Sequence, residues 1–189
     1  LKSRGLGDVY KRQGLLYSLV YTCIRVGCQT QGKHMEHTYN SHVRWTGNRG
    51  AGTASYRAYD RSWDVVVPGK AVIHCSNDPL LGGDTSKMNP EDLMLSALSA
   101  CHMLWFLHYA SDAEIIVTSY EDTPVGVGEV SAGGAGRFIA AVLHPNIRLQ
   151  SGADIAAATA IHHRIHEVCF VARSVNFPVT YEPIFEAEG

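Results

Sequence analysis

The sequence predicts a single α+β domain in which two long helices interrupt runs of β-strands. Short β-rich segments come before, between and after two segments of helical character. The chain has 189 residues, which suits one ordinary domain better than two. Apolar residues make up 46% of it, enough for a packed core, and no repeat or low-complexity linker divides it. We therefore expect one core shared by helices and strands.

The N-terminal segment differs from the rest of the chain. Residues 1–34 show no usable hydrophobic periodicity apart from one isolated apolar run, GLLYSLVYTCI. We expect 1–34 to be a non-native or disordered extension, and Met35 to be a natural start. The domain should then cover residues 35–189.

The first patterned segments predict strands. Three short β-rich runs, separated by glycine and polar residues, favour an antiparallel meander: YNSHVRWT, TASYRAY and RSWDVVV. Further on, Asn89 and Pro90 followed by two acidic residues predict the start of a helix that runs to about Ala110. That segment is apolar on nearly every face, so this helix should be buried all round.

Strand character returns after this helix in three segments: 115–121, 136–144 after a glycine-rich turn, and 175–182 at the end of the domain. Ser151 and Asp154 are spaced as in a capping box. They predict a second long helix over about residues 153–172. The two helices should pack on each other, because both are apolar and the domain is small.

Charge and hydropathy exclude some functions. Lys and Arg (16) nearly balance Asp and Glu (18), and no basic run suits a phosphate backbone, so no nucleic-acid partner is expected. No continuous apolar stretch reaches the roughly 18 residues of a membrane span, so no membrane partner is expected either. Charged residues supply only 18% of the chain, against about 25% in typical domains. A second subunit covering part of the surface is the simplest explanation.

Two of the five cysteines are candidates for chemistry. An odd number of cysteines without a CxxC pair predicts neither a disulfide scaffold nor a metal site. Cys101 and Cys169 are each the only cysteine on one of the two predicted helices. Packing of these helices could bring the two thiols together. The alternative interpretation is that both are inert core thiols.

A family resemblance raises the importance of this pair. The segment Trp45–Thr53, the motif Asn89–Leu93 and the run Ser99–Cys101, followed by Cys169, resemble the OsmC/Ohr family of peroxide reductases in kind and order. The run LLGGD at 80–84 is similar to the OsmC-like branch. The resemblance implies an OsmC-like fold, with antiparallel sheets wrapped around two long buried helices in an intertwined homodimer.

The resemblance also implies an activity, that of a two-cysteine thiol peroxidase. Cys101 would be the attacking thiolate and Cys169 the resolving thiol, Arg49 would stabilise the thiolate, and Glu91 would hold Arg49 in place. Glu91 and Cys101 lie ten residues apart on one predicted helix, a rise of about 15 Å. We therefore expect each site to combine the acid of one subunit with the cysteine pair of the other. One departure from the family is Phe170, where many relatives have proline.

The implied partners are an organic hydroperoxide, with hydrogen peroxide as a second candidate, and a dithiol reductant of lipoyl type. No metal or other cofactor is expected, and the expected location is the cytoplasm. Four apolar side chains are candidates for a substrate pocket, with core packing as the alternative: Leu98, Trp105, Phe106 and Phe170.

Several histidines leave a second function open. Three of them share a helical face with Cys169, at a spacing that could seed a metal site: His162, His163 and His166. A polar helix face is the alternative interpretation. His102 and His108 are expected to be supporting or surface residues. The rival function is therefore a non-catalytic metal- or small-molecule-binding module of the same fold.

Overall fold

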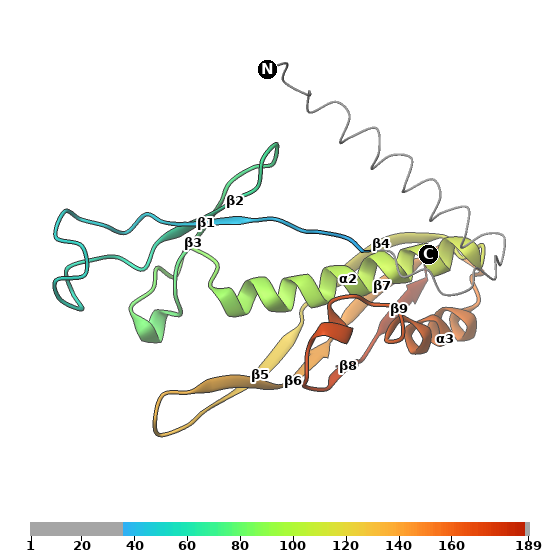
Figure 1. Ribbon diagram of the computed structural model, residues 1–189. Helices are drawn as coiled ribbons and strands as arrows, with labels where there is room; N and C mark the ends of the chain where they lie inside the picture. Colours follow the sequence, from blue (N-terminus) through green and yellow to red (C-terminus); the bar gives the residue numbers. More distant parts are fainter. Residues whose placement is uncertain (1–35, 188–189) are drawn as a thin grey trace, which may run out of the picture. The chain divides into compact units, whose positions relative to one another are not determined.

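Residues 36–187 are described by the computed structural model of the chain, and they follow the α+β order that the sequence predicts (Figure 1). The expected extension 1–34 and the expected start at Met35 lie outside the described residues. Residues 36–40 contain no helix or strand. Residues Ser41–Gly189 form one compact unit.

An antiparallel meander opens this unit. It consists of β1 (His42–Trp45), β2 (Trp63–Val66) and β3 (Ile73–Cys75), paired in that order. The predicted meander is therefore confirmed in type, but the run TASYRAY forms turns, and β3 supplies the third strand instead. A buried carboxylate joins the three strands, because Asp64 on β2 binds Arg44 at 2.9 Å and His74 at 2.7 Å.

The helix α2 (Pro90–Asp112) begins where the sequence predicts. The Asn89 side chain accepts a hydrogen bond from the Asp92 backbone N–H at 2.7 Å, and the Asp92 carboxylate accepts one from the Asn89 backbone N–H at 3.0 Å. This capping box satisfies N–H groups that a helix start leaves unpaired.

Burial of α2 differs from the prediction. Only one stripe at four-residue spacing is buried: Leu98, His102, Phe106 and Ala110. Leu104 is 62% exposed, so the expectation that this helix is buried all round is wrong for the single chain. By length and mean hydropathy α2 would also suit a membrane span, a test that core helices of soluble proteins pass as well.

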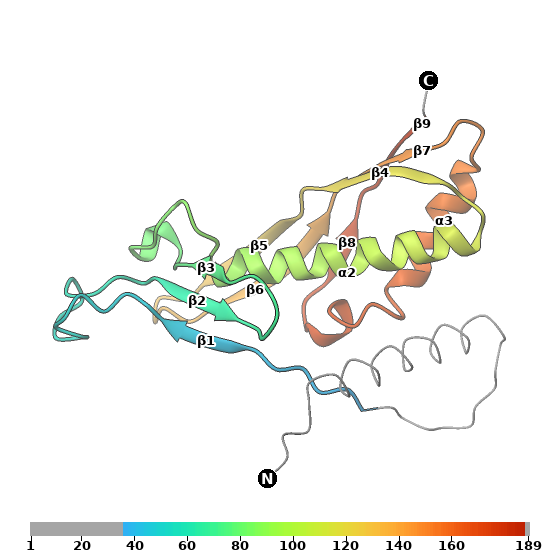
Figure 2. The same ribbon diagram turned by 90° about the horizontal axis from the view of Figure 1, so that it is seen from above.

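Six strands form a long bent ribbon: β4 (Val117–Asp122), β5 (Val125–Val130), β6 (Gly136–Leu143), β7 (Pro145–Leu149), β8 (Val179–Tyr181) and β9 (Ile184–Ala187). One half of the ribbon has the strand order β4-β7-β9 and the other half has the order β5-β6-β8 (Figures 1 and 2). After a break of one or two residues, β4 continues as β5, β6 as β7 and β8 as β9, each time in the other half. The pairs β6–β8 and β7–β9 are parallel, so the sheets are mixed rather than purely antiparallel as predicted.

Asp122 holds α2 at the bend of this ribbon. Its carboxylate accepts hydrogen bonds from the Ser99 hydroxyl of α2 at 2.5 Å and from the His144 backbone, between β6 and β7, at 2.7 Å. Because both donors meet one carboxylate, the turn of α2 that precedes Cys101 is held to the sheet.

The second helix is shorter than predicted. α3 (Ile155–Ile165) begins at Asp154, whose side chain accepts a hydrogen bond from the Ala157 backbone at 2.9 Å. The predicted extent of 153–172 and the capping role of Ser151 are therefore wrong. Cys169 lies in turns that follow α3, before a short 3₁₀ segment (Ala172–Ser174).

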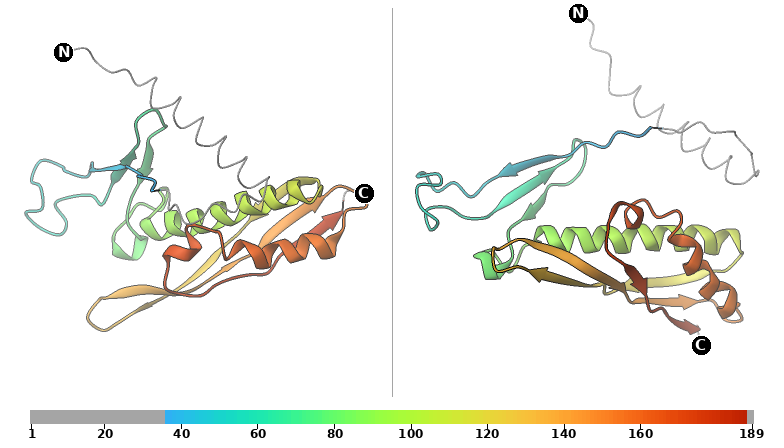
Figure 3. Two further views of the ribbon diagram at one scale, coloured as in Figure 1. Left: turned by 45° about the vertical axis from the view of Figure 1, so that its right-hand side comes forward. Right: turned by 60° about the horizontal axis from the view of Figure 1, so that its bottom comes forward.

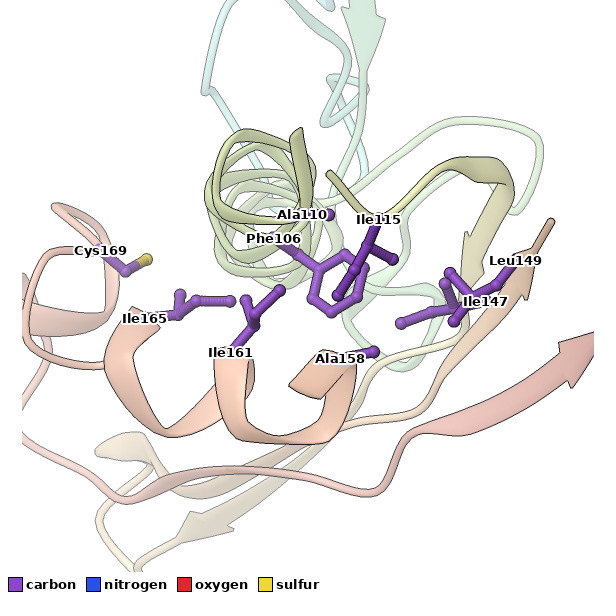
Figure 4. Close-up of a cluster of buried hydrophobic side chains, with 9 residues drawn as sticks. All are labelled: Phe106, Ala110, Ile115, Ile147, Leu149, Ala158, Ile161, Ile165 and Cys169. Carbon is purple, nitrogen blue, oxygen red and sulfur yellow. The ribbon is translucent and has the colours of Figure 1, made fainter. Parts of the chain in front are cut away.

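The predicted packing of the two helices is confirmed. α3 lies beside the C-terminal half of α2 (Figures 1 and 3), and a buried cluster joins both helices to β7 (Figure 4). Its members come from α2 and the residues after it, from β7, and from α3 and its following turn: Phe106, Ala110, Ile115, Ile147, Leu149, Ala158, Ile161, Ile165 and Cys169. Cys169 is therefore part of the hydrophobic core.

Candidate active site

The two sulfurs lie in contact across the pair of helices. The Sγ atoms of Cys101 on α2 and Cys169 after α3 are 2.8 Å apart, and both thiols are free. Figure 4 shows the sulfur of Cys169 directed toward α2. A disulfide bond is about 2.05 Å long, so closing it requires a movement of less than about 1 Å. The fold therefore brings together the two cysteines that the sequence singles out.

The two thiols differ in exposure. Cys169 is 1% exposed, whereas Cys101 is half-buried. Burial and, next, the hydrogen bond with Cys101 raise the pKa of Cys169 to about 11, although the Ala172 N–H, 3.5 Å from the sulfur, opposes this. Cys169 is therefore protonated at neutral pH. Of the two sulfurs, only Cys101 is open to attack a substrate from outside.

A histidine pair lies next to the sulfurs. His102, directly after Cys101, shares a 2.7 Å hydrogen bond between its Nε2 and Nδ1 of His162 on α3. His102 is 6% exposed and His162 is 0% exposed. Of the two expectations for His102, a supporting or a surface residue, the surface position is wrong, because the side chain is buried beside the sulfurs. The four-residue spacing of Leu98, His102 and Phe106 could have shown this from the sequence.

Both imidazoles are neutral at working pH. Burial lowers the pKa of His102 to about 4 and that of His162 to about 3. The ring of His162 stacks on Phe106 on one side, with centroids 4.7 Å apart, and on Tyr181 of β8, at 5.1 Å. Nε2 of His162 is buried without a hydrogen-bond partner.

A mainly apolar cavity of about 370 Å³ reaches Cys169. Its lining comes from both helices, β6, β8 and the turns between them: Leu98, His102, Leu143, Ile165, His166, Cys169, Ala172, Pro178, Val179 and Tyr181. Of the predicted pocket residues, Leu98 lines this cavity. Phe106 is fully buried, Trp105 packs against the core and Phe170 is 65% exposed. Cys101 is not among the residues that line this cavity.

Arg49 and Glu91 lie on the surface. The guanidinium of Arg49 donates to the carbonyls of Arg57 and Ala58 and lies 3.7 Å from Asp60, all within its own loop. None of the contacts described for it involves a cysteine. Glu91 is exposed in the first turn of α2, and the helix is continuous to Cys101 and beyond. The chain alone thus brings neither predicted charge to the sulfurs.

The predicted metal-binding face is not assembled. His162 is buried against His102, while His163 is exposed and its Nδ1 lies 2.8 Å from the Tyr181 hydroxyl. Among residues 36–187, no group of three or more histidine, cysteine or acidic side chains is arranged to hold a metal ion.

The chain is thus an α+β protein in which a thiol on a central helix contacts a second thiol in the turns after α3, beside a bent mixed ribbon. A comparison with protein-family models matches residues 82–183 to the family described as OsmC-like protein. The chain therefore belongs to the OsmC-like family, and the resemblance seen in the sequence is confirmed. A search among curated proteins finds no match.

Solved structures share the fold. An OsmC-like protein of unknown function from Vibrio cholerae is 28% identical with a TM-score of 0.71, covering 79% of this chain and 100% of that one. An organic hydroperoxide resistance protein OsmC from Legionella pneumophila is 19% identical, with a TM-score of 0.56 and coverage of 80% and 99%. An organic hydroperoxide resistance protein from Elizabethkingia anophelis is 20% identical, with a TM-score of 0.57 and coverage of 82% and 100%.

Proposed function

We propose that this protein is a thiol peroxidase that reduces organic hydroperoxides, with hydrogen peroxide as a second substrate. The observation that carries the proposal is the 2.8 Å separation of the Cys101 and Cys169 sulfurs. Family membership supports a redox role, and two relatives with the same fold are named as organic hydroperoxide resistance proteins. The protein would act in the cytoplasm, where reduced thiols persist.

Cys101 carries the first step. Its thiolate attacks the distal oxygen of the hydroperoxide, the O–O bond breaks, and the alkoxide leaves and takes a proton to become the alcohol. The sulfur is oxidised to a sulfenic acid while the peroxide is reduced. The greater exposure of Cys101 and the raised pKa of Cys169 support this assignment of roles.

Cys169 carries the second step. Its sulfur attacks the Cys101 sulfenic acid, an S–S bond forms, and the hydroxyl leaves with the thiol proton as water. The short sulfur–sulfur distance makes this step intramolecular and fast. A dithiol of lipoyl type then reduces the disulfide and is itself oxidised to a cyclic disulfide.

The charges for the first step would come from a second copy of the chain in a homodimer. Arg49 and Glu91 are exposed, and α2 leaves apolar side chains such as Leu104 uncovered. In such a dimer, Arg49 of one copy would favour the thiolate of the other copy and stabilise the departing alkoxide. Glu91 would orient that guanidinium by an ion pair.

Counting of free thiols tests the activity. Stoichiometric cumene hydroperoxide should remove two thiols per chain from the reduced protein, and Cys101→Ser should abolish the loss. Cys169→Ser should instead accumulate a dimedone-reactive Cys101 and stop after one turnover. Cys75→Ser is the matched control, since Cys75 is a buried free thiol on another element, and it should behave like the native protein.

Mixed dimers test the shared site. Arg49→Gln and Cys101→Ser should each be inactive alone. A randomly mixed dimer population should recover about a quarter of the native activity, because half of the dimers are mixed and each of these has one intact site. A mixture as inactive as its parents would place Arg49 and Cys101 of one chain in one site. An active Arg49→Gln parent would instead remove Arg49 from the mechanism.

The rival function is a binding module without this chemistry. It predicts no loss of thiols to peroxide, together with retention of a metal or small molecule through gel filtration. The described residues offer no assembled metal group, so a small organic ligand in the 370 Å³ cavity is the form of this rival that the structure allows.

A further inference from the structure

Polar contacts between α2 and the α3 segment are few. Within residues 36–187, two side-chain hydrogen bonds join α2 to α3 and its following turns. One is the contact between the cysteine sulfurs, and the other is the 2.7 Å hydrogen bond between His102 and His162. Of these two hydrogen bonds, only the one between the histidines remains when the thiols react.

The rest of the helix contact is mainly apolar, apart from a cation–π contact in which the guanidinium of Arg164 on α3 lies 4.2 Å from the ring centre of Tyr109 on α2. α3 has the sequence IAAATAIHHRI, in which small alanines alternate with a few larger side chains. Such a surface allows neighbouring packings of similar energy, because hydrophobic contacts do not favour one register strongly. A shift by one helical turn would move a side chain by about 5.4 Å, far beyond the reach of a disulfide. A short, directional hydrogen bond in a buried site excludes such shifts.

The pair is tied rigidly to both sulfurs. His102 follows Cys101 directly on α2. On the other side, the Cys169 backbone N–H donates to the carbonyl of Ile165, the last residue of α3, at 2.8 Å. The turns after α3 thus continue from the helix that carries His162, and its displacement moves Cys169 with it.

The pair is also enclosed. The His162 ring lies between Phe106 and Tyr181, and its Nε2 is buried without a partner. An unpaired buried polar atom is destabilising, so stability alone would favour an apolar side chain here. Geometry at the sulfurs, rather than stability, is what this pair supplies.

We propose that the His102–His162 hydrogen bond is the positioning element that sets the register of α2 against α3 and thereby holds Cys101 and Cys169 within bonding distance. The consequence for catalysis rests on the proposed peroxidase function. Neither histidine is a catalytic residue in this account, since both act through the placement of the sulfurs. The pair serves the second step, closure of the disulfide, and leaves the first step unchanged.

An equilibrium without peroxide tests the proposal. In buffers of reduced and oxidised dithiothreitol, the fraction of Cys101–Cys169 disulfide gives the effective concentration of the two thiols. His162→Phe keeps an aromatic ring between Phe106 and Tyr181 but removes the hydrogen bond. It should lower the effective concentration at least about tenfold, a rise in reduction potential of about 30 mV. His162→Asn, which retains a polar atom at the δ position, should recover most of the native value.

The controls separate positioning from general destabilisation. His163→Phe changes the exposed neighbour on the same helix and should leave the effective concentration unchanged. In peroxide reactions, His162→Phe should form sulfenic acid at the native rate but close the disulfide more slowly, so that dimedone labelling increases. If His162→Phe stays within twofold of the native effective concentration, or if His163→Phe lowers it equally, the proposal is overturned.

Failure of the proposed function has a different signature. A native protein that loses no thiols to peroxide would end the peroxidase account, while the dithiothreitol equilibrium would still report on the histidine pair. If circular dichroism shows that His162→Phe does not fold, the test is made with His162→Asn. A more than tenfold lower effective concentration in folded His162→Asn would then overturn the proposal.

Discussion

Acidification should destabilise this protein before its carboxylates are protonated, because the buried pair His102–His162 must stay neutral. An ordinary histidine has a pKa of about 6.5, whereas burial lowers the pKa of His102 to about 4 and that of His162 to about 3. Below pH 6.5 the unfolded chain binds protons that the folded chain excludes, so stability falls as the pH falls. The loss continues until the folded-state pKa values are reached near pH 4.

The magnitude at pH 5 follows from linkage. This pH is about 1.5 units below the unfolded pKa, and about 1.36 kcal/mol per unit gives about 2 kcal/mol for each histidine. The pair thus loses about 4 kcal/mol, a large part of the 5–15 kcal/mol of a typical domain. Carboxylates with a lowered pKa, such as Asp64 beside Arg44, lose their stabilising effect only nearer pH 4.

Urea unfolding at fixed protein concentration between pH 7 and pH 5 measures this loss. The double variant His102→Leu/His162→Phe should remove most of it, and the exposed-residue variant His163→Gln should retain it. The reasoning would be refuted if native stability at pH 5 lay within about 1 kcal/mol of its value at pH 7. An undiminished loss in the double variant would refute it equally.

Two further predictions concern the support of α2. Gly126→Ala on β5 should cost about 1–3 kcal/mol by overpacking, because a Cβ there would lie 2.5 Å from Phe138 and 2.9 Å from Leu95; unchanged urea unfolding would contradict this. Asp122→Asn, which weakens the bonds from Ser99 and the His144 backbone, should cost about 1–3 kcal/mol and slow disulfide closure. If the variant is destabilised but closes the disulfide at the native rate, then the Asp122 carboxylate stabilises the fold and does not position the sulfurs.

The sequence predicts best what depends on local chemistry. The start of α2 follows from Asn89 and Pro90, since a capping side chain and a proline at the first helical position act within one turn. The pairing of Cys101 with Cys169 follows from packing of the two apolar helices and from the family pattern. Neither prediction required the individual contacts between residues that are far apart in the sequence.

Predictions that depended on tertiary contacts were less successful. The sequence predicts that the second helix reaches about residue 172, but no local signal reveals that the chain turns after Ile165. The parallel pairing of β8 with β6 joins segments that are far apart in the sequence, and local patterns do not encode such pairing. The buried side of a uniformly apolar helix is also difficult to identify, so His102 was left with a supporting and a surface position as alternatives, and only the surface position is wrong.

The described part of the chain prepares the second chemical step more completely than the first. Around the sulfurs it supplies apolar side chains, a neutral histidine pair and a Cys169 thiol whose pKa is raised. The apolar side chains and the histidine pair hold the two sulfurs in place for closure of the disulfide, whereas the raised pKa of Cys169 disfavours the thiolate that attacks in that step. The first step needs a thiolate and a departing alkoxide, and both require a nearby positive charge. Since Arg49 lies in an exposed loop and its described contacts stay within that loop, the proposed peroxidase activity requires that a second copy bring its charges to Cys101.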